Sequence, residues 1–335
     1  MRTGSNHAGD PPTAGQQAEP TVSSPSTVTQ LATWHNDLAA WLDGLGWLRA
    51  LSDRLTGMLG PVRERHQGNL VLELMHGGRW IGHPLHPALS DLPVGLWTGV
   101  TVLDALDRDP TPRRGIDAAG VLSAAGILAA GATAVTGLTD WTVSNDEDRR
   151  VGLFHGLLNT AALGLQCASL GARVAGHRGT ARTLAGASMT VTAAAGYLGG
   201  HLVFARGVMV SRVAWSTGPR RWARALQEAD LPDDSPTAVV AEGRQIMLYR
   251  AGGTLYAIDD VCSHAGGLLS RCPVADLTAT CPLHGSRFAL TDGRVIRGPA
   301  NQPQPVLPTR IRNGWIEVRG SLPAPRRRVS ERTPQ

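Results

Sequence analysis

Two short segments in the second half of the sequence each carry one cysteine and one histidine. Cys262-Ser263-His264 is followed, after sixteen intervening residues, by Cys281-Pro282-Leu283-His284. Each spacing is short enough for one tight loop to direct both ligand side chains the same way. Two thiolates and two imidazoles in this pattern can hold a two-iron, two-sulfide cluster, with the cysteines on one iron and the histidines on the other.

Zinc and chance are the alternatives to a cluster. Zinc sites of the Cys2His2 type usually pair Cys with Cys and His with His, whereas each of these segments carries one of each. Turn-forming and small residues follow the second segment, which argues against chance: Gly285, Ser286, Gly293 and Gly298-Pro299-Ala300. We therefore interpret the segments as a [2Fe-2S] site with the ligands Cys262, His264, Cys281 and His284.

With these motifs, residues 230–320 resemble a Rieske domain, and the ferredoxin type more than the respiratory type. Respiratory members carry an extra cysteine in each loop, which join in a disulfide; the matching positions here are Gly267 and Leu283. Respiratory members also have a tyrosine where this chain has Phe288, although the companion hydroxyl is kept at Ser286. Because fewer hydrogen bonds to the sulfurs favour the oxidised cluster, we expect a reduction potential below the respiratory range.

The resemblance implies an antiparallel β-sandwich with the two cluster loops at one tip. It places the cysteines on the inner iron and the histidines on an outer iron near solvent, where a redox partner docks. Pro299 would lie over the tip in a third loop, or in a plain hairpin turn. Strand-type runs fit this fold, with Gly-containing turns at 251–253 and 291–293: residues 237–241, 245–250, 254–258, 288–290 and 315–318.

Composition narrows the functional classes. The chain has 335 residues and a formal charge of +5, carried entirely by arginine because the sequence contains no lysine. This charge is spread along the chain and is not interleaved with aromatic residues, so we expect no nucleic-acid partner. Four cysteines do not form a disulfide framework in a chain of this size. Residues 1–29 are polar and lack the apolar core of a signal peptide, so we expect a disordered tail.

Four apolar segments predict a membrane domain over residues 80–215: residues 87–106, 118–139, 151–172 and 183–205. Each is long enough to cross a bilayer core of about 30 Å. They are rich in Gly, Ala, Ser and Thr, which permit close helix packing in membranes. A soluble Ala-rich bundle is the alternative, but its helices would each show a charged face, and the last three segments show none.

An even number of spans puts both termini on one side of the membrane. More arginines flank the spans on that side than on the other, which favours cytoplasmic termini and a cytoplasmic Rieske domain in the inner membrane.

The expected order of domains is therefore an α-helical four-span membrane bundle followed by an all-β Rieske domain. Its divisions are a disordered tail (1–29), N-terminal helices (30–79), the membrane domain (80–215), a helical linker (216–229), the Rieske domain (230–320) and a second disordered tail (321–335). In the N-terminal region we expect one helix over Leu31–Leu59 and another over Val62–Met75. The Trp and Leu stripe of the first helix packs on the protein or lies on the membrane.

A second set of ionisable residues belongs to the membrane domain. The motif His83-Pro84-Leu85-His86-Pro87, with Asp140-Trp141, His155, Asn159 and Gly199-Gly200-His201, resembles uncharacterised bacterial four-helix membrane proteins. Alternating spans bring six residues to one membrane face, the face of the Rieske domain: His83, His86, Asp91, Asp140, His155 and His201. Three interpretations remain open: a haem b held by His155 and His201, a quinone or proton site, and a polar cap that joins helix ends.

These features predict a membrane-anchored carrier that moves one electron at a time between a membrane donor, quinol or haem, and an unidentified acceptor. The expected partners are the lipid bilayer and redox proteins or quinone. Two other functions stay open: an electron-supplying or catalytic component of an oxidoreductase or oxygenase system, and an iron-sulfur redox sensor. No substrate site of the chain's own is evident, so its status as an enzyme stays open.

Overall fold

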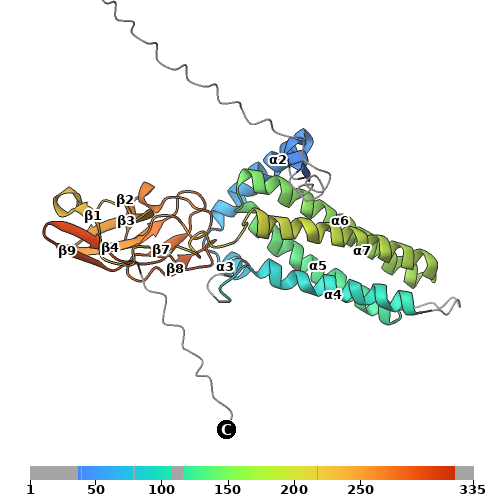
Figure 1. Cartoon of the computed structure of the whole chain (residues 1–335). Helices are drawn as coiled ribbons and strands as arrows, with labels where there is room; N and C mark the ends of the chain where they lie inside the picture. The colour runs from blue at the N-terminus through green and yellow to red at the C-terminus, as the bar shows by residue number, and fades with distance from the viewer. Residues whose placement is uncertain (1–36, 39, 78–79, 108–115, 217, 321–335) are drawn as a thin grey trace, which may run out of the picture. The chain divides into compact units, whose positions relative to one another are not determined.

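A helical N-terminal region is followed by a β-sheet domain, as the sequence predicted (Figure 1). The computed structural model describes residues 37–38, 40–77, 80–107, 116–216 and 218–320. Contacts divide the chain into Met1–Trp41 and Leu42–Gln335, and the second unit contains every element described below. The predicted tails at 1–29 and 321–335, and the start of the predicted Leu31–Leu59 helix, lie outside the described residues.

The helices have the following bounds: α2 Gly46–Arg65, α3 Leu70–His76, α4 Leu85–Leu106, α5 Ala118–Thr142, α6 Asp146–Val174, and α7 Arg178–Gly200, which continues as the π-helical turn η1 His201–Ala205. The predicted break near Leu59 is wrong, because α2 continues past Pro61 to Arg65. The chain turns at Gly68, with a φ of +82°, and Asn69 caps α3 by accepting a hydrogen bond from the Val71 amide at 2.8 Å.

Helices α4 to α7 pack as a bundle in which small residues meet large ones. A Cβ added at Gly126 of α5 would lie 2.3 Å from Trp97 Nε1, and one at Gly137 would lie 2.8 Å from His86 of α4. Polar side chains also join helices: Ser123 donates to Gln166 at 3.1 Å. Close packing through small and hydroxyl residues is what the composition of these segments predicted.

The connections between these helices are shorter than predicted. Only residues 143–145 separate α5 from α6, and residues 175–177 separate α6 from α7. Charged residues between the predicted segments 118–139 and 151–172 instead form the first turn of α6, where the acidic side chains of Asp146, Glu147 and Asp148 lie at the positive end of the helix.

Two helices of the described chain, α5 and α6, are long and apolar enough to cross a membrane. The four-span count therefore remains a prediction. Helix α4 carries Asp91 and Asp104, and α7 carries Arg178 and Arg182 at its start; neither is among the described helices that meet this test.

The β-sheet domain contains three antiparallel sheets. Their orders are β1-β10-β9, β2-β3-β4 and β5-β6-β7-β8. The strands are β1 Ala223–Gln227, β2 Thr237–Ala241, β3 Arg244–Ala251, β4 Thr254–Asp259, β5 Val274–Ala275, β6 Thr278–Thr280, β7 Arg287–Ala289, β8 Val295–Arg297, β9 Thr309–Arg312 and β10 Trp315–Val318. Short 3-10 turns, η2 Glu228–Asp230 and η3 Leu269–Arg271, interrupt the connections.

The predicted strands are confirmed in β2, β3, β4, β7 and β10, and both predicted hairpin turns join neighbouring strands. The predicted helical linker over 216–229 is wrong. Residues Ala223–Gln227 form β1, which pairs antiparallel with β10 from the far end of the domain. This pairing gives the backbone groups of β1 partners that the local sequence does not reveal.

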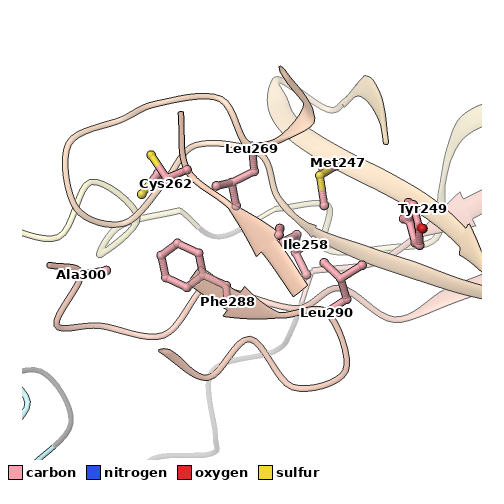
Figure 2. Close-up of a cluster of buried hydrophobic side chains, with 10 residues drawn as sticks. Met247, Tyr249, Ile258, Cys262, Leu269, Phe288, Leu290 and Ala300 are labelled. Carbon is pink, nitrogen blue, oxygen red and sulfur yellow. The ribbon is translucent and has the colours of Figure 1, made fainter. Parts of the chain in front are cut away.

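A buried apolar cluster lies between the sheets and reaches the cysteines (Figure 2). Cys262 and Ala300 lie toward one end of this cluster and Tyr249 lies at the other. Phe288 is fully buried among these side chains. The core of the β-sheet domain therefore ends against the two cysteine-containing loops.

Candidate functional site

The two predicted ligand segments fold into loops with the same backbone hydrogen bonds. In the first loop the Cys262 amide donates to Gly267 O at 2.9 Å, and the Gly266 amide donates to Cys262 O at 3.0 Å. In the second loop the Cys281 amide donates to Ser286 O at 2.8 Å, and Gly285 donates to Cys281 O at 3.0 Å. A glycine with positive φ stands four residues after each cysteine, at +80° for Gly266 and +76° for Gly285.

The segment after β8 fixes the first loop from one side. Gln304 is buried, accepts a hydrogen bond from the Ser263 amide at 3.0 Å and donates to Asp259 O and Val261 O at 2.6 Å each. The hydroxyl of Ser263 donates to Gln302 O at 2.8 Å. The residues before and within the first loop are therefore held in one conformation.

The same segment reaches the second loop. The Ala300 amide donates to the hydroxyl of Ser286 at 3.0 Å. The predicted third-loop residue, Pro299, follows a cis peptide bond from Gly298, and Ala300 is buried in the core that contains both cysteines. The predicted third loop thus adjoins the other two.

The histidine side chains offer the atoms that an iron ligand needs. Within the described residues, Nδ1 of His264 and Nδ1 of His284 are buried and have no hydrogen-bond partner. Such orphaned acceptors cost free energy unless another group binds them. The two rings lie 5.0 Å apart between centroids, edge to face, with one ring from each loop. This arrangement fits a group that binds both nitrogens.

The cysteine side chains lie deeper, because Cys262 is 0% and Cys281 is 2% exposed. Their thiols share a hydrogen bond, which lowers the pKa of Cys281 to about 6 and raises that of Cys262. Backbone amides also point at the sulfurs, from His264 and Ala265 to Cys262 and from Leu283 and His284 to Cys281. These amides favour thiolates, the form that binds iron.

The electrostatic surroundings keep both imidazoles neutral. Burial lowers the pKa of His264 to about 3, with smaller effects from the nearby charges of His284, His76 and Arg212. Burial also lowers the pKa of His284 to about 4, and the charges of Arg63 and Arg149 act in the same direction. A neutral imidazole has a free nitrogen lone pair for a metal. The four predicted ligands therefore fit a [2Fe-2S] cluster in their donor atoms and in their placement on matching loops.

The residues predicted to surround the cluster lie against these loops. A Cβ added at Gly267 would lie 2.9 Å from both Cys281 Sγ and Leu283 Cγ, so the two positions face each other across the loops. Ser286 and Phe288 are both fully buried. Because the Ser286 oxygen accepts from Ala300, its own hydrogen remains able to donate.

Replacing the Ser286 hydroxyl should change the reduction potential of the cluster. We expect Ser286→Ala to lower the potential by about 59 mV, a tenfold change in the one-electron equilibrium, because a donor that stabilises the reduced cluster is removed. A redox titration followed by electron paramagnetic resonance (EPR) measures the shift. Thr278→Val removes another buried hydroxyl of the domain, one that donates to Asp276 O, and should leave the potential unchanged. Equal potentials for wild type and Ser286→Ala would contradict this role.

The predicted exposure of the histidine edge is wrong for His264, whose exposed fraction is 7%, while His284 is partly buried. Residues of the helical region line the space beside His264. The sequence of the β-sheet domain alone could not reveal this cover.

The predicted membrane-face residues are only partly brought together. The rings of His86 and His155 lie 6.4 Å apart, whereas Asp140 contacts His76 at 3.4 Å, and Arg206 Nε donates to His201 Nε2 at 3.4 Å. His83 and Asp91 are exposed. All six lie toward the same end of helices α4 to α7, and these contacts link them to different neighbours.

The contacts of His155 favour the polar-cap interpretation. Its Nδ1 lies 2.8 Å from Ala195 O, and Asn159 Nδ2 lies 3.1 Å from its Nε2. His86 Nδ1 lies 3.0 Å from Thr133 O on α5. Both ring nitrogens of His155 thus join helix backbones and side chains. Neither these contacts nor the similarities to known proteins support haem or quinone.

Sequence reasoning missed three residues at the site. Gln304 orders the first loop, Glu73 binds the third loop, and His76 lies near His264. The repeated glycine four residues after each cysteine was a readable signal of twin loops. Nothing in the local sequence marks Gln304, Glu73 or His76, because each contacts a segment that lies far away along the chain.

Two family matches cover most of the described chain. Residues 221–309 match the Rieske [2Fe-2S] domain, and residues 82–212 match a predicted membrane protein family, DUF2231. The Rieske match begins nine residues before the predicted boundary at 230, and it includes β1.

Individual relatives match about a third of this chain or less. The anthranilate 1,2-dioxygenase ferredoxin subunit of Burkholderia cepacia is 36% identical over 27% of this chain and 82% of its own length. The naphthalene 1,2-dioxygenase system ferredoxin component of Pseudomonas putida is 29% identical over 28% of this chain and 89% of its own. The solved ferredoxin of carbazole 1,9a-dioxygenase from Nocardioides aromaticivorans IC177 is 29% identical, with a TM-score of 0.29, and covers 30% of this chain and 97% of its own.

The twin loops, the buried unpartnered imidazole nitrogens and the similarity to ferredoxin components agree with one another. The chain belongs to the Rieske [2Fe-2S] family, as a ferredoxin-type electron carrier whose Rieske domain follows a domain of the DUF2231 predicted membrane proteins.

Proposed function

We propose that this chain is a membrane-anchored Rieske electron carrier whose cluster is held by Cys262 and Cys281 on the inner iron and by His264 and His284 on the outer iron. The observation that carries the proposal is the pair of buried Nδ1 atoms without partners. Each lies on the same loop as a buried cysteine, and the two loops have matching backbone hydrogen bonds. A [2Fe-2S] cluster supplies reversible one-electron chemistry when bound.

The residues of the chain position the cluster and set its potential. Backbone amides of both loops donate to the cysteine sulfurs, and the Ser286 hydroxyl is available as a further donor. Gln304 and the core around Phe288 hold the loops rigid. A rigid site favours fast electron transfer because little reorganisation accompanies the change of charge.

Anchoring in the membrane rests on α5 and α6. Only 22% and 17% of their most apolar stretches are buried within the protein, so their apolar side chains are left for lipid. We further propose that α4 and α7 complete four spans, with both termini and the Rieske domain on the cytoplasmic side of the inner membrane. The donor would then be a membrane component such as quinol or a haem protein.

A second candidate function is electron supply to an oxygenase. The relatives from Burkholderia cepacia and Pseudomonas putida are ferredoxin components of dioxygenase systems. A carrier of that kind receives electrons from a soluble reductase and passes them to an oxygenase. The two candidates share the cluster and differ in the donor.

Washed membranes from cells that produce the full chain distinguish the two. We expect the Rieske EPR signal to sediment with the membranes, to resist an alkaline carbonate wash and to appear when NADH reduces the membrane donors with no soluble reductase added. A signal that appears only with NADH and the soluble reductase of a dioxygenase system supports the second candidate instead. A cluster that neither donor reduces, or a signal in the soluble fraction, contradicts a membrane-anchored carrier.

A further inference from the structure

The edge of the Rieske domain that carries the histidines is covered at His264 by another part of the same chain, while His284 is partly buried. The space beside His264 has a volume of about 10 Å³, which holds about one water molecule. Helical-region residues that line it include Asn145 between α5 and α6, and Met209 and Arg212 after η1. Neither a protein surface nor an aromatic headgroup fits into a space of this size.

Specific contacts join the helical region to all three loops at this edge. The Arg212 amide donates to Ser263 O, between two ligands of the first loop, at 2.9 Å. The Glu73 carboxylate of α3 accepts from the Gly298 amide of the third loop at 3.0 and 3.1 Å. Gln67 lies against the second loop, because a Cβ added at Gly285 would lie 3.1 Å from its Oε1.

The hydrogen bonds between Glu73 and the Gly298 amide are buried and do not lie at the solvent-exposed surface. Glu73 is 7% exposed, and a carboxyl group at that burial needs hydrogen-bond partners. A second polar contact accompanies it, from the Gln302 side-chain amide to Gly82 O, just before α4. Buried polar groups satisfied across two regions favour one specific way of packing them.

The charges on the covering surface suit a cluster that gains an electron. Arg63 and Arg149 act electrostatically on His284, with a smaller opposing effect from Asp146, and Arg212 acts on His264. One-electron reduction adds one negative charge to the site. Nearby cations stabilise that charge, more strongly in a site with little water than at a surface.

We propose that the docking partner of the histidine edge is the helical region of this same chain, so that electrons reach or leave the cluster through the helical region and not by direct contact with a soluble redox protein. The proposal rests on the proposed function, since it assumes the cluster at this site. It adds the surface through which the carrier exchanges electrons.

Oxidation of the reduced full chain in detergent tests this surface. The reduced cluster gives one electron to the ferric haem of cytochrome c, a soluble protein oxidant, or to ferricyanide, a small ion. In Glu73→Ala and in Glu73→Ala/Gln302→Ala, the rate constant with cytochrome c should rise about tenfold relative to wild type, because loss of these contacts opens the edge. The rate with ferricyanide should change far less. Glu64→Ala alters an exposed carboxylate of α2 and should leave both rates as in wild type.

The ratio of the cytochrome c rate to the ferricyanide rate is compared among the proteins. If this ratio is the same in wild type, in the double variant and in Glu64→Ala, the proposal is overturned, whatever the absolute rates. If Glu73→Ala fails to fold, Gln302→Ala alone provides the comparison. The Rieske EPR signal, recorded on each reduced sample, separates the two ideas. A sample without that signal lacks the cluster and tests the proposed ligand set. In a sample with the signal, the two rates test the docking proposal.

Discussion

The His264→Ala protein is expected to lose the Rieske EPR signal completely. The change removes a buried nitrogen that the protein itself leaves without a partner. Alanine provides no ligand for the outer iron, and the core behind the loop is made of apolar side chains and the two cysteines. EPR of the reduced, purified full chain measures the loss, and iron and sulfide analysis shows whether any cluster remains.

His83→Ala is the matched control for this substitution. His83 is an exposed histidine of the helical region whose Nδ1 lies 2.9 Å from Pro84 O. Its replacement should leave the EPR signal unchanged. A His264→Ala protein that keeps the wild-type signal would refute the ligand set, because no Rieske cluster can form on one histidine from this pair.

Asp259→Ala should destabilise the Rieske domain by about 3–5 kcal/mol, because it leaves the buried charge of Arg244 without its partner. Asp259 is 2% exposed at the end of β4, and its carboxylate accepts from Arg244 Nε at 2.9 Å, Ser216 at 2.8 Å and the Val261 amide at 3.0 Å. The last contact leads directly into the first cluster loop. The midpoint of urea-induced loss of the visible circular dichroism of the cluster measures the change.

Asp292→Ala provides the comparison in the same domain. Asp292 pairs with Arg294 in an exposed turn, where water screens the pair and it contributes little to stability. Its midpoint should therefore stay close to that of wild type. Similar midpoints for Asp259→Ala and Asp292→Ala would show that the buried pair does not hold the loop.

The sequence predicted the elements whose signals are local. The strands β2, β3 and β4 show apolar runs between glycine-containing turns, and the ligand spacings follow from the geometry of single loops. Strand β1 was missed because Trp222 and Leu226 are spaced as on a helix. Its strand conformation depends on β10, which lies about ninety residues further along the chain.

Contacts between regions account for the remaining differences. The burial of His264 comes from residues such as Arg212 and Asn145, which the Rieske resemblance does not include. Gln304 and Glu73 were missed for the same reason: each is an ordinary polar residue in sequence, and its role depends on a partner from another segment. The six residues predicted to share one face lie toward the same end of helices α4 to α7, where the rings of His86 and His155 lie 6.4 Å apart.

Pulsed EPR of the reduced wild-type chain tests the central claim most directly. The account predicts a [2Fe-2S] spin coupled to two nitrogen nuclei, from the imidazoles of His264 and His284, with two cysteine ligands on the other iron. Iron and acid-labile sulfide should be present at two of each per chain, as one cluster requires. A cluster without nitrogen couplings, or a chain that holds zinc in place of iron and sulfide, would contradict the account.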